Sequence, residues 1–373
     1  MEHFTIAVSE DDLDDLRSRL LRTRWPAHVE AGWAYGTDPR YLREIIDYWI
    51  KRYDWRLQER RLNAFPHFRA EVDGVRLHFI RQRGIGSRPM PLLLLHGWPG
   101  SFVQMLDLIP LLTDPAAHGG DSFDAFDVIV GSLPGYGFSD QPTAPGMNEA
   151  RMADLFYQLM THTLGFSRFA VRGGDWGGGI LTHLASSYSA AIIGTHTGST
   201  SPHVDQMPDN PSPAELKYFE NVQRWRAAEV GYSQEQSTKP QTLASALNDS
   251  PAGPASWIIE KYRRWSDCDG DVETRFSKDE LLTNVMIYWI TQTIGSSIRL
   301  YYESIGDAPL LRSTVPAAYL MSPKDMFPTP REWVARQARI DRWTEIDRGG
   351  HFLEWEEPQL VAEDLRSFLH DMR

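Results

Sequence analysis

An aspartate in a glycine-rich turn is the first residue of this sequence with an evident chemical use. The segment FAVRGGDWGGGI places Gly173-Gly174-Asp175-Trp176-Gly177 directly after an apolar run and before a helical pattern. Small residues on both sides of Asp175 are typical of a sharp strand-to-helix turn that exposes a nucleophile. The plain alternative is a glycine-rich turn in which Asp175 caps the following helix. Taken alone, the segment leaves both interpretations open.

Two more polar side chains follow strand-like runs nearer to the C-terminus. Asp325 comes after the run 317–321, and His351 comes after the run 344–347. Because parallel strands end at one edge of a sheet, both side chains are expected near Asp175. The chain order nucleophile, acid, histidine is that of α/β-hydrolases. A lone aspartate is usually a cap and a lone histidine usually a surface or core residue, but the joint spacing favours catalysis.

Upstream, LLLLHGWPGS places His96-Gly97-Trp98-Pro99 at the end of the most apolar strand-like run. A loop in this position can direct backbone N–H groups at a developing oxyanion. We predict that the N–H groups of Trp98 and Trp176 form this hole. For the ring of His96 the preferred interpretation is a structural hydrogen bond, and His96 and Pro99 are also candidates for contact with substrate.

A carboxylate nucleophile has a definite chemical consequence. Attack by Asp175 on a saturated carbon gives an alkyl ester, which an activated water must then hydrolyse. The pair of His351 and Asp325 suits that step, with the imidazole as base and the carboxylate holding its tautomer. The chain has no Gly-x-Ser-x-Gly, no His-Glu-x-x-His and no phosphate-binding glycine loop after a strand. We therefore expect neither a metal nor an organic cofactor.

The first part of the chain reads as a helical arm. Leu13, Leu16 and Leu20 recur at helical spacing behind Ser9, and a second helix is expected over 41–53. The segment between these helices is rich in Trp, Gly and Pro and is typical of an ordered connection. A hairpin is expected over 68–72 and 75–80, because Asp73-Gly74 separates the two runs.

Alternating strands and helices follow the hairpin. Apolar runs at 92–95, 128–130 and 169–171 are separated by helical patterns at 102–112 and 152–164, which predicts a mostly parallel, doubly wound sheet of the α/β class. Residues 201–305 interrupt this rhythm with Pro-rich and then helical patterns, which we interpret as an inserted cap. The predicted division is an arm with the first strands at 1–88, the first part of the core at 89–200, the cap at 201–305 and the second part of the core at 306–373, closed by an amphipathic helix.

Composition narrows the function classes. With 38 Lys and Arg against 50 Asp and Glu, the net charge is −12, and no basic run supports nucleic-acid binding. Cys268 is the only cysteine, which excludes an internal disulfide and is compatible with a reducing compartment. Because the start of the chain is acidic and no long apolar stretch occurs, we expect no signal peptide and no membrane anchor. We expect a cytoplasmic protein, with its arm packing in cis or contributing to a homodimer.

At family level, the chain resembles microsomal-type epoxide hydrolases, which carry an N-terminal extension ahead of an α/β-hydrolase domain. The resemblance runs over nearly the whole length, through motifs such as RTRWP, GWAYGTD, HGWPGS, LPGYGFSD, GGDWGG, LLTNVMIYW and RGGHFLEWEEP. It implies that Asp175 is the nucleophile, His351 the base and Asp325 its charge partner, at a position where some members have Glu. Some members also carry an N-terminal membrane anchor, which this sequence does not show ahead of the extension.

The resemblance also implies two cap tyrosines that hydrogen-bond and protonate the epoxide oxygen. The flanking words EVGYSQEQSTKP and SSIRLYYES assign these roles to Tyr232 and Tyr301, with Tyr301 preferred over its neighbour Tyr302. A phenol suits this task because it donates a proton while neutral at pH 7. The alternative is that both are ordinary aromatic residues of the cap.

The expected activity is hydrolysis of a small-molecule epoxide by water to a vicinal diol. Tryptophans at 225, 257, 265 and 289 of the cap favour a lipophilic or aryl epoxide, from a xenobiotic or a secondary metabolite, although such residues are more often core. Haloalkane dehalogenation is the nearest alternative, because it shares the Asp nucleophile and the Trp176 N–H would suit a halide. A non-catalytic binding protein with this fold is the alternative from another class.

Overall fold

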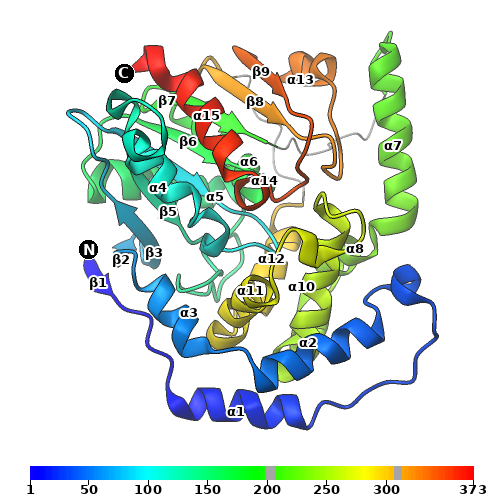
Figure 1. The fold of residues 1–373 in the computed structure, drawn as a ribbon. Coiled ribbons are helices and arrows are strands. Elements are labelled where there is room, and N and C mark those ends of the chain that lie inside the picture. The colour runs from blue at the N-terminus through cyan, green and yellow to red at the C-terminus, as the bar shows by residue number, and fades with distance from the viewer. Residues whose placement is uncertain (199–206, 306–312) are drawn as a thin grey trace.

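The computed structural model describes residues 1–198, 207–305 and 313–373. Within these residues nine strands form one sheet in the order β1-β2-β3-β5-β4-β6-β7-β8-β9 (Figure 1). The strands are β1 (Glu2–Phe4), β2 (His67–Val72), β3 (Val75–Gln82), β4 (Met90–Leu95), β5 (Phe126–Gly131), β6 (Phe169–Gly173), β7 (Ile192–Thr197), β8 (Ala317–Met321) and β9 (Arg342–Glu345).

The centre of the sheet is parallel. Strand β4 pairs with β5 on one side and β6 on the other, and the order continues in parallel through β7 and β8 to β9. Residues 92–95 of β4 are fully buried, because a parallel strand is covered by helices on both faces and requires apolar side chains throughout. The α/β-hydrolase fold predicted from the apolar runs is confirmed.

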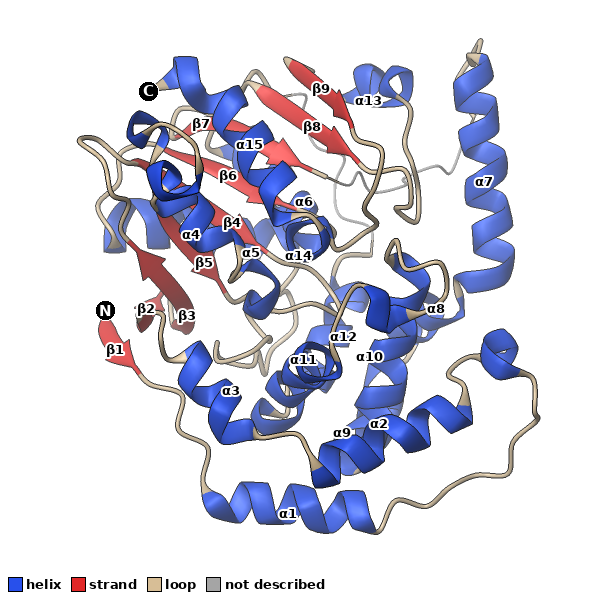
Figure 2. Ribbon diagram, viewed as in Figure 1, coloured by secondary structure: helices blue, strands red, loops and turns tan. Residues whose placement is uncertain are grey.

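Helices cover both faces of this sheet (Figure 2). On one face α4 (Leu108–Thr113) packs against α15 (Pro358–Leu369), and on the other α5 (Glu149–Gln158) packs against α6 (Trp176–Ser187). The short helices α13 (Arg331–Gln337) and α14 (Leu353–Glu356) lie in the connections near the C-terminus. The loops that follow β4, β6, β8 and β9 therefore lie together at the carboxyl edge of the sheet.

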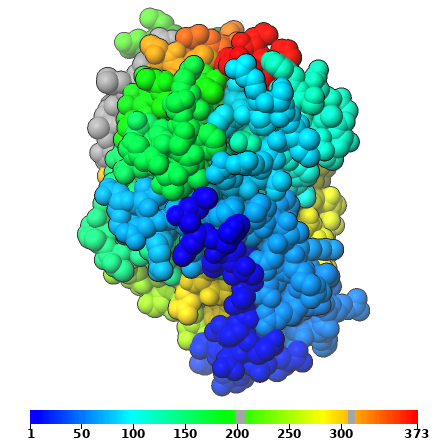
Figure 3. Space-filling view, turned by 90° about the vertical axis from the view of Figure 1, so that its left-hand side faces the viewer, coloured from blue at the N-terminus to red at the C-terminus, as the bar shows by residue number. Residues whose placement is uncertain are grey.

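The N-terminal arm crosses from the sheet to the cap. Its helices are α1 (Glu10–Leu21), α2 (Pro39–Lys51) and α3 (Trp55–Leu62), and β1 ahead of them pairs with β2 at the sheet edge. Figure 3 shows the first residues, in dark blue, running over the outside of the molecule toward the cap. The predicted hairpin is present as antiparallel β2 and β3 with its turn at Asp73-Gly74.

Helices build the cap over the carboxyl edge of the sheet. They are α7 (Pro213–Glu229), α8 (Gly231–Thr238), α9 (Pro240–Asp249), α10 (Ala252–Trp265), α11 (Lys278–Thr291) and α12 (Ile294–Glu303). The predicted boundary at 200/201 falls within residues 199–206 and the one at 305/306 falls at the start of residues 306–312, and both of these segments lie outside the described residues. Those two boundaries stay predictions.

Several expected elements differ in detail. The helix expected over 102–112 is a 3-10 turn at Phe102–Met105 followed by α4, because Pro110 has no N–H and fits only the first turn of a new helix. The strand expected over 344–347 is β9, which begins two residues earlier. Sequence analysis missed β1, which is only three residues long, and β7, whose buried His196 and threonines hide the strand pattern.

In the part of the chain that the structure describes, none of the helices has the length and apolar character needed to cross a membrane.

Candidate active site

Asp175 stands at a strained turn between β6 and α6. Its backbone has φ 52° and ψ −129°, a conformation that non-glycine residues rarely adopt and that is found at functional sites. A Cβ at Gly173 would lie 2.5 Å from the Gly177 carbonyl oxygen, and one at Gly177 would clash with the Leu95 carbonyl oxygen. The small residues beside Asp175 are therefore required by close backbone approach, as the motif predicted.

The loop after β4 contacts this carboxylate directly. The Trp98 N–H donates to Asp175 Oδ1 over 2.8 Å, so Asp175 faces this loop instead of capping α6. Two residues of α11 hold the loop in place: Asn284 Nδ2 donates to the Pro99 carbonyl at 2.8 Å, and Tyr288 OH donates to the Gly100 carbonyl at 2.6 Å. The cap thereby fixes the predicted oxyanion hole from above.

His351 lies between the other two carboxylates. Its Nε2 is 3.3 Å from Asp175 Oδ2, and its Nδ1 is 2.7 Å from Asp325 Oδ1. Burial alone would lower the pKa of His351, but the negative charges and hydrogen bonds of Asp325 and Asp175 outweigh it and raise that pKa above its ordinary value. While both carboxylates are charged, His351 therefore holds a proton at neutral pH.

The cap brings both predicted tyrosines above Asp175. Tyr232 comes from α8 and Tyr301 from α12, and their ring centroids are 6.0 Å apart. The Trp98 ring stacks on Tyr232 at 5.6 Å, and the Trp176 ring meets Tyr301 edge-on at 4.7 Å. Burial and the nearby charge of Asp175 raise the pKa of Tyr232, and burial also raises the pKa of Tyr301. Both phenols are therefore protonated across the physiological range.

Tyr302 points elsewhere. Its side chain is 53% exposed, whereas Tyr301 is 9% exposed within the cluster of aromatic rings around Asp175. This placement favours Tyr301 over Tyr302 as the second phenol of the site.

His96 is buried with both ring nitrogens engaged by the backbone. Its Nδ1 lies 3.0 Å from the Gly97 carbonyl oxygen, and its Nε2 accepts from the Leu133 N–H at 3.3 Å. Burial lowers the pKa of His96 to about 4, so the ring is neutral. These contacts favour the structural interpretation of His96 over contact with substrate. Pro99 contributes its carbonyl to Asn284, as described above.

Sequence reasoning gave no role to Asn284 and named Trp265 only among the cap tryptophans that favour a lipophilic substrate. Trp265 lies at the end of α10, and its carbonyl oxygen accepts a hydrogen bond from the backbone N–H of His351 at 2.8 Å. The centroid of the Trp265 ring lies 5.5 Å from that of the His351 imidazole. Asn284 holds the loop after β4, and Ser101 Oγ donates to its side-chain oxygen at 2.7 Å. The available signal for Asn284 was a polar residue inside the apolar run of LLTNVMIYW. Trp265 carried no signal beyond its aromatic character.

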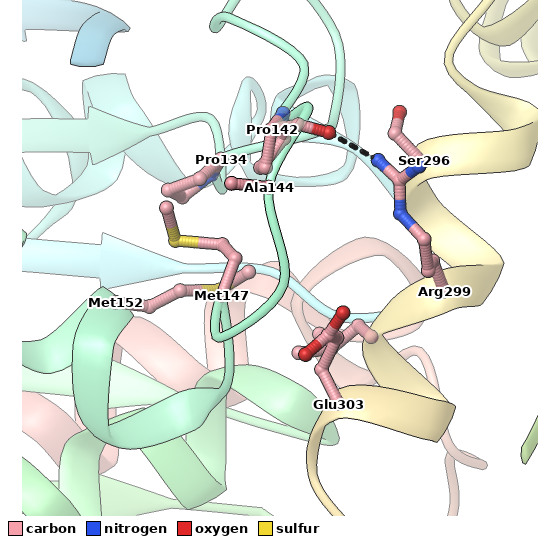
Figure 4. A pocket seen from close by; sticks show the side chains of 9 residues that line it. Pro134, Pro142, Ala144, Met147, Met152, Ser296, Arg299 and Glu303 are labelled. Carbon is pink, nitrogen blue, oxygen red and sulfur yellow. Dashed lines mark hydrogen bonds between the residues drawn. The ribbon is translucent and has the colours of Figure 1, made fainter. Parts of the chain in front are cut away.

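Two hollows of the molecule lie away from Asp175. One, of about 10 Å³, is lined by residues of α12 and of the chain after β5, with Arg299 donating to the Pro142 carbonyl (Figure 4). This space fits about one water molecule. The other, of about 480 Å³, lies between the arm, the hairpin and the end of α11. Neither is lined by any of the predicted site residues.

The described residues contain no group of three or more His, Cys, Asp or Glu side chains placed to hold a metal ion.

Known proteins match this chain over nearly its full length. A model of the epoxide hydrolase N terminus matches residues 1–105, and a model of the alpha/beta hydrolase fold matches residues 90–358. Epoxide hydrolase 1 of Oryctolagus cuniculus is 35% identical over 404 residues, which cover 98% of this chain and 88% of that protein.

Solved structures agree with these matches. The crystal structure of juvenile hormone epoxide hydrolase from the silkworm Bombyx mori is 31% identical with a TM-score of 0.86, covering 100% of this chain and 94% of that one. Aspergillus niger epoxide hydrolase is 27% identical with a TM-score of 0.87, covering 100% and 96%. The resemblance to microsomal-type epoxide hydrolases is thus confirmed: the chain belongs to the epoxide hydrolase family, and is an enzyme of the hydrolase class built from the epoxide hydrolase N-terminal segment and the α/β-hydrolase fold.

Proposed function

We propose that this protein converts a lipophilic or aryl epoxide and water into a vicinal diol, through an alkyl ester on Asp175 that a water activated by His351 and Asp325 hydrolyses. One observation carries the proposal. His351 Nε2 lies 3.3 Å from one oxygen of Asp175, while the Trp98 N–H binds the other at 2.8 Å. A nucleophile, its base and an oxyanion donor therefore meet at a single carboxylate.

Ring opening is the first step. Oδ2 of Asp175 attacks a ring carbon, and the C–O bond of the epoxide breaks. Tyr232 or Tyr301 hydrogen-bonds the departing oxygen and supplies its proton, because both phenols are neutral and face the site. The proton held by His351 then replaces the one lost by the tyrosine. The products of this step are an ester at Asp175 and neutral His351.

The loss of charge prepares the second step. Esterification removes one of the two negative charges that raise the pKa of His351, so Nε2 becomes able to take a proton from water. The hydroxide attacks Cγ of Asp175, and the oxyanion forms on Oδ1, where the Trp98 N–H already donates. The bond from Cγ to Oδ2 breaks, and the leaving alkoxide takes the proton from His351. The proton that remains on the new carboxyl group of Asp175 then moves to His351, so that Asp175 is again charged and His351 again protonated.

The cluster of aromatic rings around Asp175 supports an apolar substrate. Trp98, Tyr232, Trp265 and Tyr301 have ring centroids 5.2 to 6.2 Å from one another where they meet. An aromatic environment of this kind favours flat or lipophilic groups. Epoxide and water are the only reactants that this chemistry requires.

Isotope labelling under single-turnover conditions tests the proposal. With styrene oxide in H₂¹⁸O, the wild type should release diol and acquire ¹⁸O in the peptide that contains Asp175, because water attacks Cγ. Asp175→Ala should be inactive, and His351→Gln should accumulate the ester. If an epoxide panel gives neither diol nor a covalent adduct with the wild type, the proposal is wrong.

The same enzyme preparation separates the alternatives. A haloalkane dehalogenase would release chloride from a chloroalkane, whereas the two tyrosines of this site favour an oxygen leaving group that needs a proton. A non-catalytic binding protein would bind an epoxide without forming an ester.

A further inference from the structure

Three consecutive backbone N–H groups around His351 are held by hydrogen bonds. The Gly350 N–H donates to Glu356 Oε2 at 3.0 Å, and the Phe352 N–H donates to Glu356 Oε1 at 3.0 Å. Between them the His351 N–H donates to the Trp265 carbonyl at 2.8 Å. The carboxylate of Glu356 thus binds the backbone of the residue before His351 and of the residue after it.

The same carboxylate also reaches the cap. Glu356 Oε2 accepts the Asp267 N–H at 2.7 Å, two residues beyond the end of α10. The two backbones are in close contact here, because a Cβ at Gly350 would lie 2.6 Å from both the Asp267 nitrogen and the Trp265 carbonyl oxygen. Glu356 therefore joins the loop of His351 to the cap segment that packs on it.

We propose that Glu356 is a positioning residue. It holds the His351 imidazole at the distance from Asp175 that catalysis requires, and it links that distance to the packing of the cap on the core. This inference rests on the proposed two-step reaction. Glu356 contacts no reacting atom, so its effect passes through the backbone of residues 350–352. His351 acts as a base only in ester hydrolysis, whereas in ring opening it only returns a proton to the tyrosine after Asp175 has attacked and the C–O bond has broken. Disturbing the carboxylate should therefore slow the second step selectively.

The next residue in the chain provides a matched control. Glu357 pairs with Arg275 at 3.1 Å and with Arg348 at 2.9 Å, and these are side-chain contacts instead of contacts with the loop backbone. Glu356→Gln and Glu357→Gln make the same substitution at adjacent positions of the chain. Only the first replaces a carboxylate oxygen that accepts backbone N–H groups with an amide N–H₂ that cannot.

The test follows ester formation and ester decay separately in single turnovers with styrene oxide. We expect Glu356→Gln to form the ester within about twofold of the wild-type rate and to hydrolyse it about 10-fold to 100-fold more slowly, since small misplacements of a catalytic group have effects of this size. Glu357→Gln should match the wild type in both steps.

Other outcomes would overturn the proposal. Wild-type ester decay in Glu356→Gln would show that the carboxylate does not position the base, and an equal loss in both steps with a lower melting temperature would show a structural role alone. If Glu356→Gln does not fold, Glu356→Asp keeps the carboxyl group with a shorter reach, and its ester decay should also be selectively slow. A wild-type enzyme that forms no ester would instead contradict the proposed function.

Discussion

At the scale of single residues, the site depends on how three side chains share charge. Burial disfavours a charged His351, yet the carboxylates of Asp325 and Asp175 raise its pKa. Asp325 stays charged through the proposed cycle, whereas Asp175 loses its charge on esterification. In the ester intermediate the pKa of His351 is therefore set by burial, which lowers it, and by Asp325, which raises it, so the pH dependence of ester hydrolysis is sensitive to that carboxylate.

Asp325→Asn should change this pH dependence in a defined direction. Because Asp325 raises the pKa of His351, its neutralisation lowers that pKa, and protonation should switch off ester hydrolysis at a lower pH than in the wild type. The plateau rate should still fall by about 10²-fold to 10⁴-fold, because the tautomer is no longer held. Rapid-quench measurement of ester decay against pH checks both effects. Asp347→Asn, at an exposed position of the loop that carries His351, should leave the profile unchanged, and an Asp325→Asn profile that is not shifted to lower pH would contradict the assignment.

Removal of single hydroxyls tests the two phenols. Tyr232→Phe and Tyr301→Phe should each slow ester formation by about 10²-fold or less, since the other tyrosine can still donate, and should leave ester decay unchanged. Tyr302→Phe is the matched control, because that side chain is 53% exposed. Stopped-flow quenching of the tryptophan fluorescence near Asp175 measures ester formation. Slower ester formation in Tyr302→Phe with a normal Tyr301→Phe would reverse the choice between the two neighbours.

At the scale of elements, helices of the cap determine where the phenols of Tyr232 and Tyr301 lie. The position of the cap in turn depends on its contacts with the core. One such point is the start of α7, where Ser212 and Glu215 form a reciprocal capping box. Glu215 is buried and also binds Arg336 of α13 at 2.9 Å. The hydrogen bond from Arg336 lowers the pKa of Glu215 to about 2. This contribution to stability is present above the ordinary carboxyl pKa and is lost as the pH falls through about 2.

Ser212→Ala should destabilise the protein by about 1 kcal/mol, because the first turn of α7 loses its side-chain acceptor. Ser245→Ala removes a hydroxyl from an exposed position of α9 and should change the free energy of unfolding by less than about 0.5 kcal/mol. Urea denaturation at pH 7 compares the two variants. Equal stabilities would mean that the capping box contributes nothing measurable.

At the scale of the whole molecule, the N-terminal arm binds the core and the cap together. Strand β1 pairs with β2 of the sheet. Farther along the arm, Tyr48 OH donates to Asp279 of α11 at 2.8 Å, and Tyr53 OH lies 3.0 Å from the hydroxyl of Thr283. The same α11 holds the loop after β4 through Asn284. The arm therefore supports the site through one helix of the cap.

Trp49→Ala should show how much stability this packing provides. Trp49 is 4% exposed and belongs to the main hydrophobic core, so its truncation should cost about 3–5 kcal/mol of unfolding free energy. Tyr35→Ala is the control from the same arm, because Tyr35 is 82% exposed and its loss should cost less than about 0.5 kcal/mol. Chemical denaturation followed by circular dichroism measures both. A wild-type midpoint for Trp49→Ala would mean that the arm packs only loosely.

The amino-acid sequence alone determined the fold class and the order of the chemical groups along the chain. Apolar runs must be buried on both faces, so they indicate parallel strands, and residues that follow such strands share one edge of the sheet. Asp175, Asp325 and His351 were placed together by this reasoning, and the structure brings them within hydrogen-bonding distance or close to it. The position of the Trp98 N–H, which donates to Asp175 Oδ1, follows from the same rule.

Tertiary structure alone decided what depends on contacts between distant segments. Tyr301 and Tyr302 are adjacent and identical in type; the resemblance preferred Tyr301, but only the packing of α12 shows that Tyr301 is buried near Asp175 while Tyr302 is exposed. The role of Asn284 depends on a loop 185 residues away in the chain, and that of Glu356 on Asp267, 89 residues away. Local patterns report the burial and backbone preferences of neighbouring residues, whereas these contacts arise only when the cap closes on the sheet.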